Sequence, residues 1–389
     1  MKRQDYFYQT KSFIVFLLLL VLLHQPAPVF SSEDTSMSIN GAAMKLVQFC
    51  IDPRVGLDEQ AVSILVAHVL SLKQNKEFAL PKSLDSTGVY YEFDTKINFS
   101  RFIDYSYSAL IPPVITRPSS LRYSVWTNSK GESQKLPDSW KPISPGEAPL
   151  IIHGLQRESD TPDLNTNVYH EYDVRRTLIL LNHAGRQVLI SISKQVSKSG
   201  VGKKGVIMGN DNDWNYYYSG EPGTPRTGLG WVKSYIYDFF SVGVYLESGN
   251  SPTIVKSGFF HWLRAGWSGI NFVKPNHIIA GMKRFSRDCK MSLESPLLPA
   301  PRQIISIYER LSNMPTFDLN KKYAALKKEQ LSSAARAGKI SKSEPDEQVS
   351  FTDTPKEQML QELMLEYLKV ILGKSTLLGK QYFSFMPSS

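Results

Sequence analysis

Asp211, Asp213 and Asn215 alternate along the chain as the first three ligands of a calcium-binding loop do. The rest of that pattern is absent, because Tyr216 replaces the glycine of the sharp turn and Pro222 replaces the final glutamate. The alternative is a polar turn whose Asn and Asp side chains bond to their own backbone. The spacing therefore favours a turn over a calcium site, and we predict no metal.

Gly200, Gly202 and Gly205 spell G-x-G-x-x-G, the pattern of a dinucleotide-binding loop. That fingerprint requires a strand before the loop and a helix after it, whereas 206–213 resembles strand and turn. We therefore expect no dinucleotide and no other cofactor. Because Lys203 and Lys204 flank flexible glycines, anion binding remains an alternative to a solvated hairpin loop.

The residues for acid–base or zinc chemistry are scattered. Glu171 and Asp173 share a face of an expected strand and could form a carboxylate pair, although solvent-facing charge is the simpler interpretation. A zinc or hydrolytic site would have to assemble in space, because no H-E-x-x-H or nucleophile motif occurs. The histidines that could take part in such a site are His153, His170, His183, His261 and His277.

Residues 209–272 include fifteen aromatic residues, about twice the 11% aromatic share of the whole chain. Such rings dominate both protein interiors and binding surfaces. We expect core packing for 231–240 and 259–267. Polar neighbours predict that some of the rings at Trp214, Tyr216, Tyr217 and Tyr218 are exposed, so these four are the predicted ligand-binding residues.

Periodicity predicts helices near both ends of the chain and strands between them. The predicted helices are 57–72, 259–272, 304–311 and 354–371, the last with Thr354 as N-cap and Glu357 within a capping box. Its apolar stripe predicts docking on the protein's own body, with Glu362 and Glu366 off the stripe. We expect residues 321–342 to be a mobile or helical linker.

The predicted strands fall within 89–107, 121–126, 177–181, 187–193, 241–247 and 253–255. In the fourth of these, Val188, Ile190 and Ile192 point one way, and Leu189, Ser191 and Ser193 the other. Five prolines in 137–162 predict a loop or a domain joint.

The amino terminus predicts a secretory signal peptide. Lys2, Arg3 and Lys11 precede an apolar run from Phe13 to Leu23, which is too short to cross a bilayer and ends before Pro26. The alternative is an uncleaved anchor. Cleavage after residue 31 would leave no transmembrane span and lower the net charge from +9 to +7, which favours anionic lipid, glycan or wall polymer over nucleic acid.

The chain has two cysteines, Cys50 and Cys289. In an oxidising compartment such a pair predicts a disulfide, and two buried free thiols are the alternative. The bridge would close a loop of about 240 residues.

Together these patterns predict an α+β fold with a mainly antiparallel sheet flanked by helices. The expected parts are a signal peptide (1–31), a helical segment (32–84), a β-rich aromatic domain (85–290), a helix with a basic linker (291–350) and an amphipathic helix (351–389). We expect an exported periplasmic or extracellular protein with a binding or structural role in the cell envelope, whose aromatic loop meets a glycan, a lipid or an envelope protein. The alternative is an exported hydrolase, which a pocket gathering His and carboxylate groups would favour.

Overall fold

The computed structural model describes residues 37–71, 76–127, 136–226, 230–248, 253–340 and 354–383. The chain divides into two units, 1–38 and 39–389, and the fold below is that of the second. The predicted signal peptide lies outside the described residues. No helix in the described ranges is both long enough and apolar enough to cross a bilayer.

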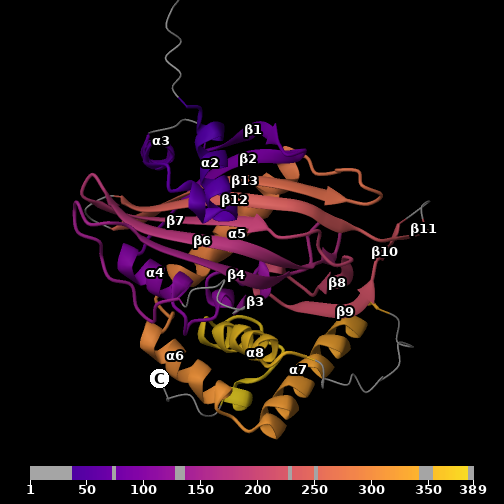
Figure 1. Ribbon diagram of the computed structural model, residues 1–389. Coiled ribbons are helices and arrows are strands. Elements are labelled where there is room, and N and C mark those ends of the chain that lie inside the picture. Colours follow the sequence, from indigo (N-terminus) through magenta and orange to yellow (C-terminus); the bar gives the residue numbers. More distant parts are fainter. Residues whose placement is uncertain are drawn as a thin grey trace, which may run out of the picture. The chain divides into compact units, whose positions relative to one another are not determined.

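An antiparallel sheet of eight strands forms the centre of the unit (Figure 1), in the order β1-β2-β13-β12-β7-β6-β4-β3. This confirms the α+β class. The strands are β1 (Glu77–Ser83), β2 (Ser86–Thr95), β3 (Leu121–Thr127), β4 (Leu150–Asp160), β6 (Glu171–His183), β7 (Arg186–Gln195), β12 (Tyr235–Ser248) and β13 (Ile254–Gly266). Two small sheets join β5 (Val168–Tyr169), β8 (Lys203–Ile207) and β9 (Tyr216–Pro222), and β10 (Thr224–Arg226) with β11 (Gly230–Val232).

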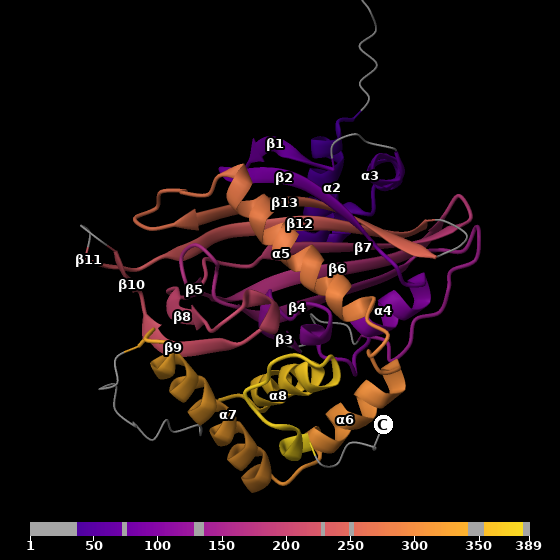
Figure 2. The same cartoon turned by 180° about the vertical axis from the view of Figure 1, so that it is seen from behind.

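Helices cover both faces of the large sheet. On one face lie α2 (Ile39–Ile51) and α3 (Glu59–Leu70), where the rings of His68 and Tyr90 meet at 4.8 Å. On the other face lies α5 (Pro275–Leu293), whose Ser286 hydroxyl is 2.8 Å from that of Tyr91 (Figure 2). Neighbouring residues of a strand point to opposite faces, so Tyr90 packs against the α2–α3 layer and Tyr91 contacts α5.

Helix α4 (Phe99–Tyr107) packs on the same face as α5, where the Phe102 ring lies 5.0 Å from that of Tyr245 on β12. Beyond the β3 edge lie α6 (Pro301–Ser312), α7 (Thr316–Arg336) and α8 (Lys356–Ile371). As predicted, α8 docks on the body of the protein, where it contacts β3, α6 and α7. Its N-cap is Pro355, one residue after the predicted cap at Thr354. Glu362 and Glu366 are buried like the apolar stripe, so the helix is enclosed on every side.

The predicted β6–β7 hairpin is confirmed, with Leu181 paired to Val188. Its turn needs two positive φ angles, which Ala184 (50°) and Gly185 (79°) adopt. The predicted alternation also holds: Val188, Ile190 and Ile192 are fully buried, and Ser191 and Ser193 face a cavity under α5.

Three predictions of local structure are wrong. The predicted helix 259–272 is strand β13 with a following loop, because short apolar runs have no decisive period. Residues 99–107 form α4 instead of a strand, since Asn98 caps the helix by accepting a hydrogen bond from the Arg101 N–H at 2.8 Å. The expected loop 137–162 contains β4. The stretch 321–342, expected to be a mobile or helical linker, is helical over most of its length as part of α7.

The structure leaves Cys50 and Cys289 as buried free thiols, not the expected disulfide. The sheet separates them: Cys50 lies on α2, with its Sγ 3.6 Å from the Arg175 carbonyl oxygen of β6, and Cys289 lies on α5 across the sheet. Burial raises the pKa of both thiols, that of Cys289 to about 12.

We therefore expect both thiols to be unreactive in the folded protein. In denaturant without reductant, iodoacetamide should modify both Cys50 and Cys289, because only unfolding exposes them and allows the thiolates to form. Intact mass after alkylation measures this. Alkylation that requires prior reduction would contradict the structure.

Candidate functional site

The predicted aromatic loop is mainly core. Trp214 and Tyr216 are only 1% and 2% exposed, and Tyr217 and Tyr218 are half-buried. The Tyr218 ring lies 4.0 Å from the guanidinium of Arg122. None of the four lines the cavity under α5. Ligand binding by these residues stays a prediction, but the geometry gives Trp214 and Tyr216 a packing role.

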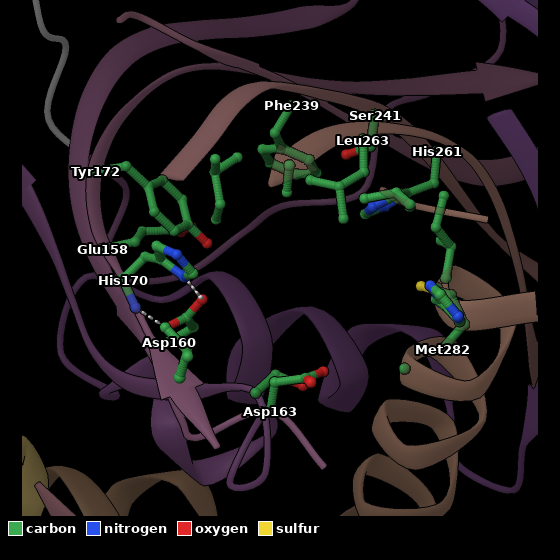
Figure 3. Close-up of a pocket in the computed structure, with 18 of the residues that line it drawn as sticks. Glu158, Asp160, Asp163, His170, Tyr172, Phe239, Ser241, His261, Leu263 and Met282 are labelled. Carbon is green, nitrogen blue, oxygen red and sulfur yellow. Dashed lines mark hydrogen bonds and ion pairs between the residues drawn. The ribbon is translucent and has the colours of Figure 1, made fainter. Parts of the chain in front are cut away.

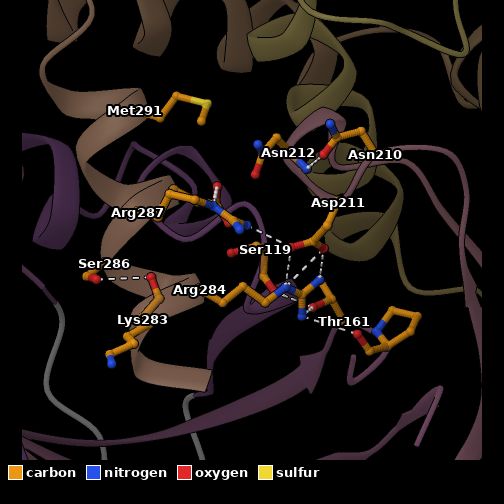
Figure 4. A network of polar contacts seen from close by, with 12 residues as sticks. Ser119, Thr161, Asn210, Asp211, Asn212, Lys283, Arg284, Ser286, Arg287 and Met291 are labelled. Carbon is orange, nitrogen blue, oxygen red and sulfur yellow. Dashed lines mark hydrogen bonds and ion pairs between the residues drawn. The ribbon is translucent and has the colours of Figure 1, made fainter. Parts of the chain in front are cut away.

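The carboxylate that suggested a calcium loop is held by arginines of α5 (Figure 4). Asp211 accepts hydrogen bonds from Arg284 at 2.6 Å and from Arg287 at 2.7 Å. Burial opposes its charge, but these two partners outweigh burial and lower the pKa of Asp211. The Asn215 side-chain oxygen accepts from Lys369 at 2.6 Å. These oxygens already accept hydrogen bonds from cationic side chains, so the contacts hold residues 211–215 against α5 and α8.

The glycine pattern serves close packing. The N–H groups of Gly200, Gly202 and Gly205 donate to backbone carbonyls, so none is available to an anion. A Cβ on Gly202 would lie 2.6 Å from Nε2 of His170 and 2.7 Å from Oγ of Ser234, closer than atoms can approach. Gly202 is therefore required where this loop meets the wall of the cavity.

The other residues considered for acid–base chemistry divide between surface and cavity. Asp173 pairs with Arg157 at 3.1 Å, and Glu171 lies 3.5 Å from Lys203, so these carboxylates are engaged separately. His170, His261 and His277 line the cavity. Among the described residues, no group of three His, Cys, Asp or Glu side chains could hold a metal ion.

The cavity lies between α5 and the face of the sheet that carries Tyr91, and its volume is about 520 Å³. One wall is apolar and comes from β12, β13 and α5. Its main side chains are Phe239, Phe259, Leu263, Ile278, Met282 and Phe285. In Figure 3, Phe239, Leu263 and Met282 face Glu158, Asp160 and Tyr172 across the open space. The cavity is therefore amphipathic.

The polar wall comes from β4, β6 and the 161–170 segment, and one ion pair and one carboxylate–imidazole contact fix it. Glu158 accepts a hydrogen bond from Arg176 at 2.9 Å, and both residues are buried. Asp160 Oδ2 lies 3.7 Å from Nδ1 of His170, and Oδ1 accepts the backbone N–H of the same residue. Burial raises the pKa of Asp160, and His170 acts in the opposite direction.

His261 shows that the apolar wall excludes charge. It lies on β13, with its ring 5.0 Å from that of Phe239. Burial lowers the pKa of His261 to about 4, so the imidazole is neutral at neutral pH. A neutral ring can still donate or accept one hydrogen bond beside an apolar ligand.

Arg117 adds an available cation to the inner end of the cavity. Burial opposes its charge, but Tyr107, Tyr245 and Glu158 outweigh it and raise the pKa of Arg117. Among the described residues, no carboxylate lies within ion-pair distance of this guanidinium. Arg117 can therefore bind a carboxylate or another anionic group of a ligand.

Sequence reasoning missed this cavity because it assembles from segments more than 100 residues apart. One signal was present: after Pro275, the apolar residues Ile278, Met282, Phe285, Cys289 and Leu293 have helical spacing, which predicts α5. No sequence pattern links Asp160, His170 and Arg117 to that helix.

Comparisons with known proteins give little further guidance. No family model and no curated protein matches the chain. Among solved structures, the human StarD13 (DLC2) lipid transfer and protein localization domain matches with a TM-score of 0.27 and 9% identity. The match covers 62% of this chain and 99% of that domain. Folds at that TM-score differ in most of their detail, so the function has to be argued from the cavity alone.

Proposed function

We propose that this is an exported protein that binds an elongated, mainly apolar molecule of the lipid class in the cavity under α5. The observation that carries the proposal is the cavity of about 520 Å³ with one apolar and one polar wall. Pockets for organic ligands have volumes of about 300–1,000 Å³, are mostly apolar and contain a few polar groups that fix orientation.

A lipid suits this cavity better than a glycan does. Against Phe239, Leu263 and Met282, sugar hydroxyls would lose water without gaining hydrogen bonds, which costs free energy for each group. An acyl chain gains from the same contact because its burial removes apolar surface from water. Arg117 supplies a counter-charge for a carboxylate at the inner end.

Export is supported by the N-terminal sequence alone. The basic residues before Phe13–Leu23 and the polar stretch 32–36 are typical of a signal peptide. A lipid-binding protein outside the cytoplasm would carry poorly soluble molecules between membranes or shelter them from water.

Native mass spectrometry of the purified full chain, followed by organic extraction, tests the ligand class. We expect a bound species that extraction removes, and saturable binding of a fluorescent fatty acid to the extracted protein that oleate displaces. Absence of both a bound species and saturable fluorescence would contradict the proposal.

A second candidate function is ester hydrolysis, because the cavity gathers His and carboxylate groups. Nε2 of His170 and Oγ of Ser234 are buried without a hydrogen-bond partner and pack against the same glycine, Gly202. With Asp160 they resemble a nucleophile, a base and an orienting carboxylate. Binding ranks first, because neither atom is open to the cavity as a nucleophile must be.

A fluorophosphonate probe distinguishes these two functions. Covalent labelling of Ser234 that is lost in Ser234→Ala and His170→Ala would establish the hydrolase. If the protein binds the fatty acid but takes up no label, only binding is supported.

A further inference from the structure

Five loops gather at one end of the large sheet, on the right in Figure 1. We name this end the loop end; it consists of residues 84–85, 161–167, 196–202, 230–234 and 266–274. The strand registers place the loops together. Tyr235 at the start of β12 pairs with Gly266 at the end of β13, and Leu263 pairs with Thr87 at the start of β2.

The loop end exposes apolar side chains that a soluble surface would bury. Of eleven exposed large hydrophobic residues in the described ranges, six lie here and five are spread over the rest of the unit. The six are Leu84 (58%), Leu164 (46%), Val196 (51%), Trp231 (52%), Ile270 (54%) and Phe272 (40%). They belong to all five loops, so a broad, flat partner could contact them together.

The charged residues at the loop end favour an anionic partner. Lys198, Lys233 and Lys274 are exposed there, and within the described ranges none of the three has a carboxylate at ion-pair distance. Of the acidic residues in these loops, Asp163 caps its own turn by accepting from the N–H of Thr166, and Asp85 faces Arg264 at 3.8 Å. The three lysines outnumber the two carboxylates, so net positive charge accompanies the exposed apolar residues.

The cavity opens at the same end. Its lining residues include Asp163, Asn165, Thr166, Phe272 and His277, all of them exposed and all in or next to these loops. Of the other lining residues, Tyr245 lies toward the opposite end of β12 from Tyr235, and Arg117 is close enough to Tyr245 to interact with it, so we call this part of the cavity its inner end. A surface that met the loop end would therefore face the mouth of the cavity.

We propose that the loop end docks on an anionic lipid bilayer, with Trp231 and Ile270 entering the interface and the lysines facing lipid phosphates. Tryptophan is enriched at membrane interfaces, and basic residues near the surface add attraction to anionic lipids. This inference rests on the proposed lipid ligand, which would then pass between the bilayer and the cavity without crossing water.

Vesicle flotation of the full chain tests the docking surface. We expect recruitment to phosphatidylcholine vesicles containing one third phosphatidylglycerol, weaker recruitment to phosphatidylcholine alone, and loss of the difference at high salt. Ile270→Ser with Lys274→Gln should weaken recruitment about tenfold or more. The matched control is Phe317→Ser with Lys321→Gln, which changes an exposed apolar residue (78%) and a lysine four positions later on α7.

Every variant keeps the apolar run Phe13–Leu23, so its contribution to recruitment is common to all. Equal recruitment by both kinds of vesicle, or equal losses in the loop-end and control variants, would overturn the proposal. Fatty-acid binding in solution is measured on the unchanged chain and on the same variants. If the unchanged chain binds fatty acid but is not recruited to vesicles, docking is wrong and the lipid cavity stands; if it is recruited but binds no fatty acid, the proposed ligand class is wrong.

Discussion

Gly281→Phe should weaken fatty-acid binding by at least about a hundredfold, or about 2.7 kcal/mol. Gly281 lies on α5 and lines the cavity at the exposed edge of the stripe that turns Ile278, Met282 and Phe285 toward it. A Cβ built on it meets no atom within 4 Å, so a larger side chain enters open space. The phenylalanine ring would occupy the room that the ligand needs. Titration of a fluorescent fatty acid measures the effect.

Gly281→Ala is the matched control for this experiment. A methyl group leaves most of the cavity open, and alanine stabilises a helix interior by roughly 1 kcal/mol relative to glycine. We therefore expect nearly unchanged fatty-acid binding and a higher melting temperature. Full binding by a folded Gly281→Phe protein would show that the ligand lies elsewhere, and equal losses in both variants would point to a distorted helix.

Glu362→Gln should lower the free energy of unfolding by about 3–5 kcal/mol, the usual cost of breaking a buried ion pair from one side. The Glu362 carboxylate on α8 accepts hydrogen bonds from Arg122 of β3 at 2.8 Å and from Lys327 of α7 at 2.5 Å. Without that charge, two buried cations would have no anion. Urea denaturation measures the loss. The exposed Glu329, 3.9 Å from Arg336, is the control, and Glu329→Gln should change stability by less than about 1 kcal/mol.

The same network predicts how stability depends on pH. Burial alone would raise the pKa of Glu362, but Arg122 and Lys327 outweigh it and lower that pKa to about 2. The folded state therefore binds fewer protons than the unfolded state at this site, and the contribution is complete above pH 4.5. It should be lost as the pH falls from about 4.5 to about 2, a change of about 3 kcal/mol. The Glu362→Gln protein should not show this loss. If its stability fell with acid as steeply as that of the unchanged chain, the assignment to Glu362 would be wrong.

Burial determines the direction of the pKa shift of Lys327 but not that of its partner Glu362. It lowers the pKa of Lys327 to about 8, and Arg122 acts in the same direction, against the attraction of Glu362. The Glu362 carboxylate is stabilised by two cations, whereas Lys327 has one anionic partner and is also repelled by Arg122. At neutral pH all three groups are charged, which is why removal of the carboxylate has so large an effect.

Helix α8 shows what apolar periodicity alone can predict. The sequence predicted its apolar stripe, its start within one residue and its docking on the body of the protein. It did not predict that Glu362 and Glu366 are buried, because the arginine and lysine that neutralise Glu362 come from β3 and α7. Helical period describes one helix, whereas ion pairs depend on which elements surround it.

The candidate site shows the same limit. The aromatic density of 209–272 drew attention to Trp214–Tyr218, but density does not separate a core from a surface, and Trp214 is buried. The cavity instead depends on β13, most of which was predicted to be a helix beginning at residue 259, and on α5, which was not predicted. Because β13 was predicted wrongly, the apolar wall to which it contributes could not be predicted.

By itself the sequence determined the α+β class, the β6–β7 hairpin with its two faces, and the docking of α8. These follow from local alternation, turn chemistry and apolar period, which act between near neighbours. Only the tertiary structure decided that Cys50 and Cys289 lie on opposite sides of the sheet and that Arg117, His170 and Met282 share a cavity. Strand order and the packing of α5 bring these residues to their places, and both depend on contacts between distant segments that no local pattern records.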